Sequence, residues 1–174
     1  MTTYVRTYTT PNRTRRRHPV RVIVVHATAG GETGALAWLC NPASKVSADF
    51  VITKTGVVYQ LHSDLDAWFT WHAGQSAWRG LEVWTTTASG ARIGTLNPVS
   101  VGIELVNRND GQDPYPPAQI AALTDVTRQL MTRYTIPLAY IARHCDVSPG
   151  RKTDPAGFPW HVWLTQLVTH RADD

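Results

Sequence analysis

The segment "RHCDVSPGRKTDPAGFPW", residues 143–160, carries side chains that bind metals at two points. His144 and Asp154 bracket a turn-forming stretch, and Lys152 stands just inside it. The proline and glycine between them favour a bend that returns the chain on itself. An imidazole and a carboxylate brought together in this way are typical ligands of a catalytic zinc ion.

A second imidazole, His26, ends the β-branched run "VRVIVVH" at residues 20–26. His144 likewise ends a run, "LAYIARH", that reads as a strand, and ligands gather where strands end and loops begin. Two imidazoles and one carboxylate are a frequent zinc ligand set, with water in the fourth position. Because a lone histidine is more often a satisfied polar group, the set predicts a metal site only if the two strands are neighbours.

The elements that must position these residues alternate between strands and helices. Strands are expected at 20–26, 48–53, 57–61, 100–106 and 138–144, with the second and third joined as a hairpin around "KTG". Helices are expected at 33–39, from Pro117 through about residue 134, and at 160–170. This pattern predicts an α/β fold, a central and mostly β-sheet core flanked by helices, in a single domain.

Length and charge limit the organisation of the chain. The 174 residues suit one domain at 20–174, preceded by an irregular basic arm at 1–19 that is read as solvated. The net charge of +4 favours a polyanionic neighbour, yet no nucleic-acid motif, membrane span or signal peptide is evident. We therefore expect a monomer that is made in the cytoplasm and has no nucleic-acid or membrane partner.

Six motifs in a fixed order carry a family resemblance. They are "VVHATAG", "KVSADFVI", "GVVYQLH", "TWHAG", "NPVSVGIEL" and the segment at 143–160, and together they extend from about Val20 to about Trp163. The chain resembles the zinc-dependent N-acetylmuramoyl-L-alanine amidases, a family that includes peptidoglycan recognition proteins, phage lysozyme-type amidases and a cytoplasmic anhydro-muropeptide amidase. The resemblance implies that 20–174 is a zinc amidase catalytic domain.

The same resemblance implies roles for five residues. His26, His144 and Asp154 match the zinc ligands, and Zn²⁺ would polarise the amide carbonyl and activate water. Glu104 matches the general base, and its alternation with two apolar neighbours turns its side chain to the opposite face. Lys152 matches the lysine that stabilises the developing oxyanion.

Four further residues are expected to contact the substrate. His72 matches a substrate-contacting histidine, and Trp71 is expected to line the same groove. Asn97 and Arg151 are candidates for holding the peptide stem or the glycan, since a guanidinium pairs well with a carboxylate.

The chain departs from its relatives at three places. Ala48 stands where many relatives carry a tyrosine near the metal, which places more weight on Glu104. Asp49 stands where histidine is frequent. The insert at 76–94 is expected to influence substrate choice.

The leading hypothesis is zinc-dependent hydrolysis of the amide bond between N-acetylmuramic acid and L-alanine in peptidoglycan, by a phage endolysin that reaches the wall after release. A peptidoglycan recognition module that does not cut is one alternative, although such modules typically lack the third zinc ligand, here Asp154. A cytoplasmic muropeptide-recycling amidase is the other. The basic arm could help such an enzyme settle on an anionic wall.

Overall fold

The computed structural model of the chain describes residues 4–76, 85–86 and 92–169. Its main feature is a mixed sheet of six strands in the order β1-β5-β4-β9-β3-β10. These strands are β1 (Tyr4–Val5), β3 (Val22–Ala27), β4 (Phe50–Ile52), β5 (Val58–Gln60), β9 (Ser100–Leu105) and β10 (Ile141–Arg143). The strands β4, β9, β3 and β10 run parallel, and β5 pairs antiparallel with β4. The predicted α/β class and the hairpin are confirmed.

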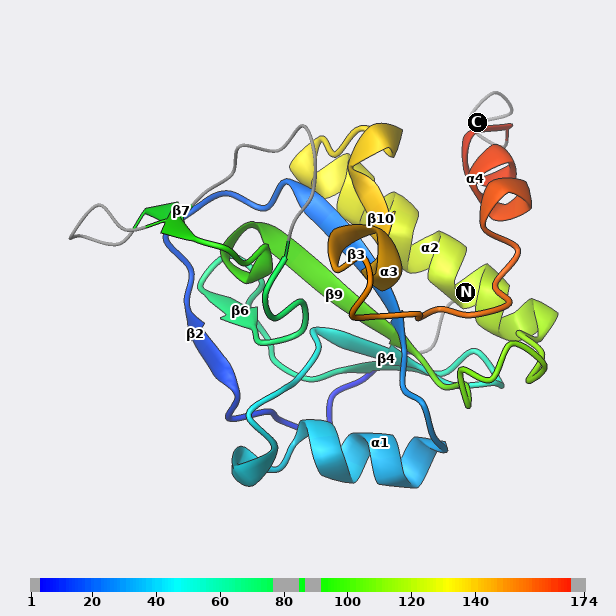
Figure 1. Cartoon of the computed structure of the whole chain (residues 1–174), viewed down its shortest axis with the longest axis horizontal. Helices are drawn as coiled ribbons and strands as arrows, with labels where there is room; N and C mark the ends of the chain where they lie inside the picture. The colour runs from blue at the N-terminus through cyan, green and yellow to red at the C-terminus, as the bar shows by residue number, and fades with distance from the viewer. Residues whose placement is uncertain (1–3, 77–84, 87–91, 170–174) are drawn as a thin grey trace.

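Helices cover both faces of this sheet (Figure 1). α1 (Glu32–Leu39) packs on one face, while α2 (Pro117–Tyr134) and α4 (Trp160–Thr169) pack on the other. The alternation of β4 decides which residue meets which helix: Val51 packs with α1, whereas Phe50 and Ile52 join the core under α2. Among the described residues, no helix has the length and apolar character needed to cross a bilayer.

The neighbouring strands β3 and β9 turn their polar residues to the same face. In β3, Ile23 and Val25 enter the large core, so His26 follows Val22 and Val24 onto the opposite face. In β9 the residues Val101, Ile103 and Leu105 enter that core, and Ser100, Gly102 and Glu104 take the opposite face. Every residue of β3 is therefore buried, on both sides of the sheet.

The N-terminal segment, expected to be an irregular and solvated arm, departs from that expectation only in part: residues such as 6–9 and 17–19 are irregular and exposed, but the segment also contains two short strands and an anchored arginine. Besides β1, residues Arg13–Arg15 form β2, which pairs antiparallel with β6 (Trp68–Thr70). The guanidinium of Arg16 donates hydrogen bonds to four backbone carbonyls, those of Leu65, Trp68, Pro98 and Ser100. These four acceptors fix an arginine that the charge run alone would place in solvent.

The strand expected at 138–144 is also shorter than predicted. A 3₁₀ turn, η3 (Leu138–Tyr140), precedes β10, and His144 opens the short helix α3 (His144–Val147) rather than ending the strand. Two more 3₁₀ turns, η1 (Pro42–Ser44) and η2 (Asn97–Val99), connect other elements. Most of the insert at 76–94 lies outside the described residues, apart from the paired strands β7 (Thr85–Thr86) and β8 (Arg92–Ile93).

Candidate metal centre

The carboxyl-terminal ends of three adjacent strands bring the predicted ligands together. His26 lies near the end of β3, and Glu104 is its partner in the register of the neighbouring strand β9. β10 pairs with β3 on the other side, so His144, the first residue after β10, lies at the same edge. Parallel strands that end together gather their polar side chains at one site. The condition set by the sequence, that the two histidine-bearing strands be neighbours, is met.

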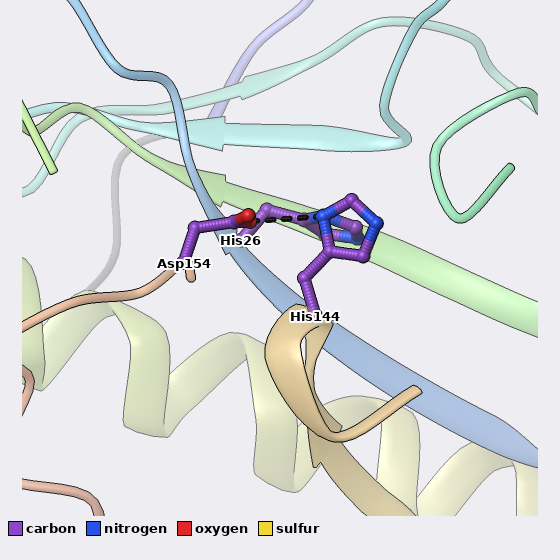
Figure 2. Close-up of side chains that lie close together, drawn as sticks. All are labelled: His26, His144 and Asp154. Atoms are coloured by element: carbon purple, nitrogen blue, oxygen red, sulfur yellow. Dashed lines mark hydrogen bonds and ion pairs between the residues drawn. The ribbon is translucent and has the colours of Figure 1, made fainter. Parts of the chain in front are cut away.

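Three atoms converge on one point (Figure 2). The Nδ1 atoms of His26 and His144 are 2.8 Å apart, and Oδ2 of Asp154 lies 2.9 Å from Nδ1 of His144 and 3.5 Å from that of His26. Ligand atoms at zinc-bond lengths in a tetrahedral site are separated by about 3.3 Å. The observed spacing and the donor set of two imidazoles and one carboxylate therefore fit a zinc ion.

The loop that returns Asp154 to the site is held at both ends. The backbone carbonyl of Asp154 accepts from the N–H of Cys145, 3.0 Å away, beside the other ligand. Asn109 fastens the far side, because its Oδ1 accepts from the N–H of Ala156 at 2.7 Å and its Nδ2 donates to Oγ1 of Thr153 at 3.1 Å. Asn109 has a φ of 58°, a left-handed conformation that asparagine tolerates better than most residues. The sequence analysis missed this residue, and the turn-forming "NRND" was its only signal.

Burial of the histidines and hydrogen bonds to Asp154 together set the charge states that metal binding requires. Desolvation lowers the pKa of His26 to about 4, and it also holds the pKa of His72 well below its ordinary value. Burial by itself would raise the pKa of Asp154, but hydrogen bonds to His144 and His26 outweigh it and lower that pKa. At neutral pH, neutral His26 and anionic Asp154 therefore face each other, which is the form in which both bind metals.

Glu104 behaves differently from Asp154. Its Oε2 is buried and has no hydrogen-bond partner among the described residues. Burial raises the pKa of Glu104 to about 8, the negative charge of Asp154 adds to the rise, and the positive charge of Lys152 opposes it. A carboxyl group that titrates near neutral pH is suited to accept a proton during a reaction.

A cavity of about 590 Å³ opens over these residues. Glu104, His144, Asp154 and Lys152 contribute to its lining, as do His72 and Arg151. Such a volume suits a ligand larger than a single residue or sugar. The structure thus brings both predicted catalytic residues and two of the three predicted metal ligands, His144 and Asp154, to the cavity wall. The third, His26, is buried and contacts these two ligands.

The cavity lining also contains large apolar side chains that the sequence analysis missed. Trp38 of α1 contributes to the lining with 57% of its surface exposed, and Val46 contributes with 39% exposed. A large exposed aromatic ring at a polar site is suited to pack on a sugar or peptide. The position of Trp38 within a predicted helix gave no signal, because the helix face that would be exposed was unknown.

The structure does not bring all four predicted substrate contacts to the cavity. The indole of Trp71 donates to Oγ1 of Thr14 at 2.9 Å, and Trp71 lies outside the cavity lining formed by the described residues. Asn97 also lies outside that lining, since its Oδ1 accepts from the N–H groups of His72 and Ala73 at 3.1 and 2.7 Å. Both support the segment that carries His72.

Arg151 does line the cavity, although its guanidinium is partly engaged. It donates to the backbone carbonyls of Ala73 and Gln75 and to Oγ of Ser148. Its role as a carboxylate-binding residue stays a prediction, since the cavity lining leaves it within reach of a ligand.

Ala48 and Asp49, two positions that depart from the family pattern, make contacts inside the protein. Ala48 packs with α1 in an apolar cluster. Asp49 is buried, and its carboxylate accepts from Gly102 N–H and pairs with His62, each at 2.7 Å. Asp49 thus forms a buried hydrogen-bonded pair with His62 next to strand β9.

A sheet edge where two imidazoles and a carboxylate could hold a metal ion, with a second, protonatable carboxylate at the adjoining cavity, defines a candidate metal-dependent hydrolase. The family model for N-acetylmuramoyl-L-alanine amidase matches residues 16–157, and the chain belongs to this family. The expected family is thereby confirmed.

Curated relatives agree with this family. The amidase AmiD of Escherichia coli K12 is 32% identical over 164 residues, which cover 86% of this chain and 54% of AmiD. The 1,6-anhydro-N-acetylmuramyl-L-alanine amidase AmpD of Haemophilus influenzae is 33% identical over 125 residues, covering 71% of this chain and 59% of AmpD. The chain therefore spans little more than half the length of these relatives.

Solved structures share the fold. AmiD in complex with the substrate anhydro-N-acetylmuramic acid-L-Ala-D-γ-Glu-L-Lys matches with a TM-score of 0.69 and 32% identity, over 85% of this chain and 57% of that one. An AmpD structure matches with a TM-score of 0.73 and 27% identity, over 97% and 94% of the two chains. A mutant Bacillus subtilis endolysin has a TM-score of 0.68 over 96% and 99%, but at 20% identity this likeness concerns the fold alone.

Proposed function

We propose that this chain is a zinc-dependent amidase that hydrolyses the bond between the lactyl group of muramic acid and L-alanine in soluble muropeptides. The observation that carries the proposal is the convergence of His26, His144 and Asp154 on one point, at a cavity that Glu104 and Lys152 also line. A zinc ion held by the three ligands would supply Lewis-acid polarisation of the amide carbonyl and an activated water.

The protein's own residues complete the chemistry. Glu104 takes a proton from the attacking water, because its carboxyl group faces the cavity and titrates near neutral pH. The same group can pass that proton to the leaving amine of L-alanine. Lys152, on the cavity wall, places a positive charge where the carbonyl oxygen gains negative charge.

The choice of muropeptides over intact wall rests on the relatives. AmiD is described with an anhydro-muramyl tripeptide as its substrate, and AmpD is named for the 1,6-anhydro sugar. The endolysin neighbour is only 20% identical and supports the fold alone. We therefore favour the recycling type of amidase over the endolysin that the sequence led us to expect. The exposed ring of Trp38 would pack against the sugar or the first stem residues.

The test uses the purified chain with zinc, after chelation, and as the Asp154→Ala variant. Each form is given the anhydro-muramyl tripeptide and, separately, intact delipidated sacculi, and new L-alanine amines and lactyl carboxylates are quantified. Metal-dependent release from the soluble substrate but not from sacculi supports the proposal. Clearing of sacculi would restore the endolysin hypothesis. Binding of either substrate without release would favour a recognition module.

A further inference from the structure

His72 lines the cavity and also contacts the predicted metal ligand His26 directly. Its Nδ1 is 3.0 Å from Nε2 of His26, and the two rings meet edge to face with centroids 5.1 Å apart. On its other side, Nε2 of His72 is 2.9 Å from Oγ of Ser100, which in turn lies 2.7 Å from the carbonyl oxygen of Leu96. His26, His72, Ser100 and Leu96 thus form a buried hydrogen-bonded chain that leads away from the metal site.

One arrangement of protons satisfies this whole chain. The Leu96 carbonyl can only accept, so the hydroxyl of Ser100 donates to it and accepts from Nε2–H of His72. A neutral His72 with its proton on Nε2 has a bare Nδ1, which accepts from Nε2–H of His26. His26 then presents an unprotonated Nδ1 to the point where His144 and Asp154 converge.

We propose that His72, anchored by Ser100, is a positioning residue that fixes the tautomer and ring orientation of His26 for metal binding. This differs from the substrate contact that the family resemblance implied for His72. A hydrogen-bond partner on the far nitrogen of a histidine ligand both orients the ring and strengthens its metal bond. The inference deepens the proposed function and rests on it, since it takes the metal to be zinc.

The surrounding strand is shaped to hold the His72 ring in place. Gly102, two residues after Ser100 on the same face of β9, lies under the ring, and a Cβ atom there would be only 2.4 Å from Cγ of His72. The backbone of His72 is fixed as well, because its N–H donates to Asn97. By contrast, Nε2 of His144 is buried without a partner in the part of the chain that the structure describes. The support is therefore specific to one of the two imidazole ligands.

The first experiment measures zinc affinity by competition with a chelator, independently of amidase activity. In His72→Phe, which fills the same space without an acceptor, we expect the zinc dissociation constant to rise about 10- to 100-fold. Ser100→Ala removes only the anchor and should give a smaller rise in the same direction. His161→Phe, on the exposed surface of α4, is the matched control and should bind zinc as the wild type does.

Two spectroscopic measurements separate positioning from substrate contact. In the zinc-loaded protein labelled with ¹⁵N-histidine, long-range ¹H–¹⁵N spectra should place the protons of both His26 and His72 on Nε2. The visible spectrum of Co²⁺-substituted Ser100→Ala, which retains both histidines, should differ from that of the wild type.

An unchanged zinc affinity and cobalt spectrum in both variants, with a raised KM, would overturn the inference and make His72 a substrate contact. A proton on Nδ1 of His72 would overturn it as well. Failure of the wild-type chain to bind zinc would instead refute the metal assignment of the proposed function. The wild-type chain tests the metal assignment and the two variants test the role of His72, so the failure of one can be distinguished from the failure of the other.

Discussion

Replacing Glu104 with glutamine should reveal what the ionisable carboxyl group contributes to stability and activity, with the rest of the site unchanged. The variant keeps the size of the side chain and removes its charge. In the metal-free protein the pKa of Glu104 is raised to about 8 from an ordinary value of 4.5, chiefly by burial. The folded chain therefore holds this proton more tightly than the unfolded chain does. The resulting stability is fully present below about pH 4.5 and is lost as the pH rises through about 8.

The size of the effect follows from linkage. With these two pKa values, the free energy of unfolding should fall by about 1.4 kcal/mol between pH 7 and pH 9. Glu104 as a residue is only half-buried and Lys152 lies nearby, so solvent screening reduces the expected fall to about 1 kcal/mol. The lowered pKa values of His26 and His72 change the free energy of unfolding mainly below the range of pH 7 to 9. Within that range both histidines are largely neutral in the folded and in the unfolded chain.

The assay is urea denaturation of chelated wild type and Glu104→Gln at half-unit steps from pH 6.5 to 9. Taking the difference between the two curves removes every group that both proteins share. We expect the wild type to lose stability relative to the variant as the pH rises. In the zinc-loaded form, the variant should retain its metal and lose about 10²- to 10⁴-fold in kcat. Parallel pH profiles in the two proteins, or a fully active variant, would refute the assigned environment and role of Glu104.

Four further substitutions test the rest of the site and the arm. Asp154→Ala should remove stoichiometric zinc, measured by metal analysis after gel filtration, while the chain stays folded by circular dichroism. Lys152→Ala should lower kcat on the anhydro-muramyl tripeptide by about 10²- to 10³-fold with zinc content unchanged; a change in KM alone would contradict an oxyanion role. Trp38→Ala should raise KM about 10-fold with little change in kcat, as expected for the loss of an aromatic contact. Arg16→Met should cost about 2–4 kcal/mol in urea denaturation, because four backbone carbonyls lose their charged donor.

Much of the site could be predicted from the sequence because its parts depend on local rules. The alternation of side chains along a strand placed Glu104 opposite to Ile103 and Leu105, and the structure agrees. The ends of two strand-like runs marked both histidines, and the structure supplied the condition that the two strands are neighbours. The turn between His144 and Asp154 needed only its own proline and glycine. Each of these conclusions concerns neighbours within a few residues or within one strand.

The parts that could not be predicted depend on which distant segment covers a residue. Trp71 and Trp38 look alike in the sequence, yet Trp71 is held by Thr14 of the N-terminal segment while Trp38 lines the cavity. The run of arginines was expected to be solvated, because the neighbouring sequence gives no sign of the four backbone carbonyls that accept hydrogen bonds from Arg16. Asn97 was expected at the substrate, but it accepts two backbone N–H groups instead. In each case a long-range partner decided the role.

Strand β9 combines local rules with long-range contacts, because one of its faces carries three residues that the site requires. Ser100 anchors His72, Gly102 leaves room for the His72 ring, and Glu104 turns its carboxylate to the cavity. A period of two places all three on one face, and a register slip of one residue would turn all three into the core together. The register between β9 and β3 therefore determines both the orientation of the predicted ligand His26 and the position of Glu104, the proposed general base. A change at one of these three positions that shifts the strand should impair metal binding and proton transfer at once.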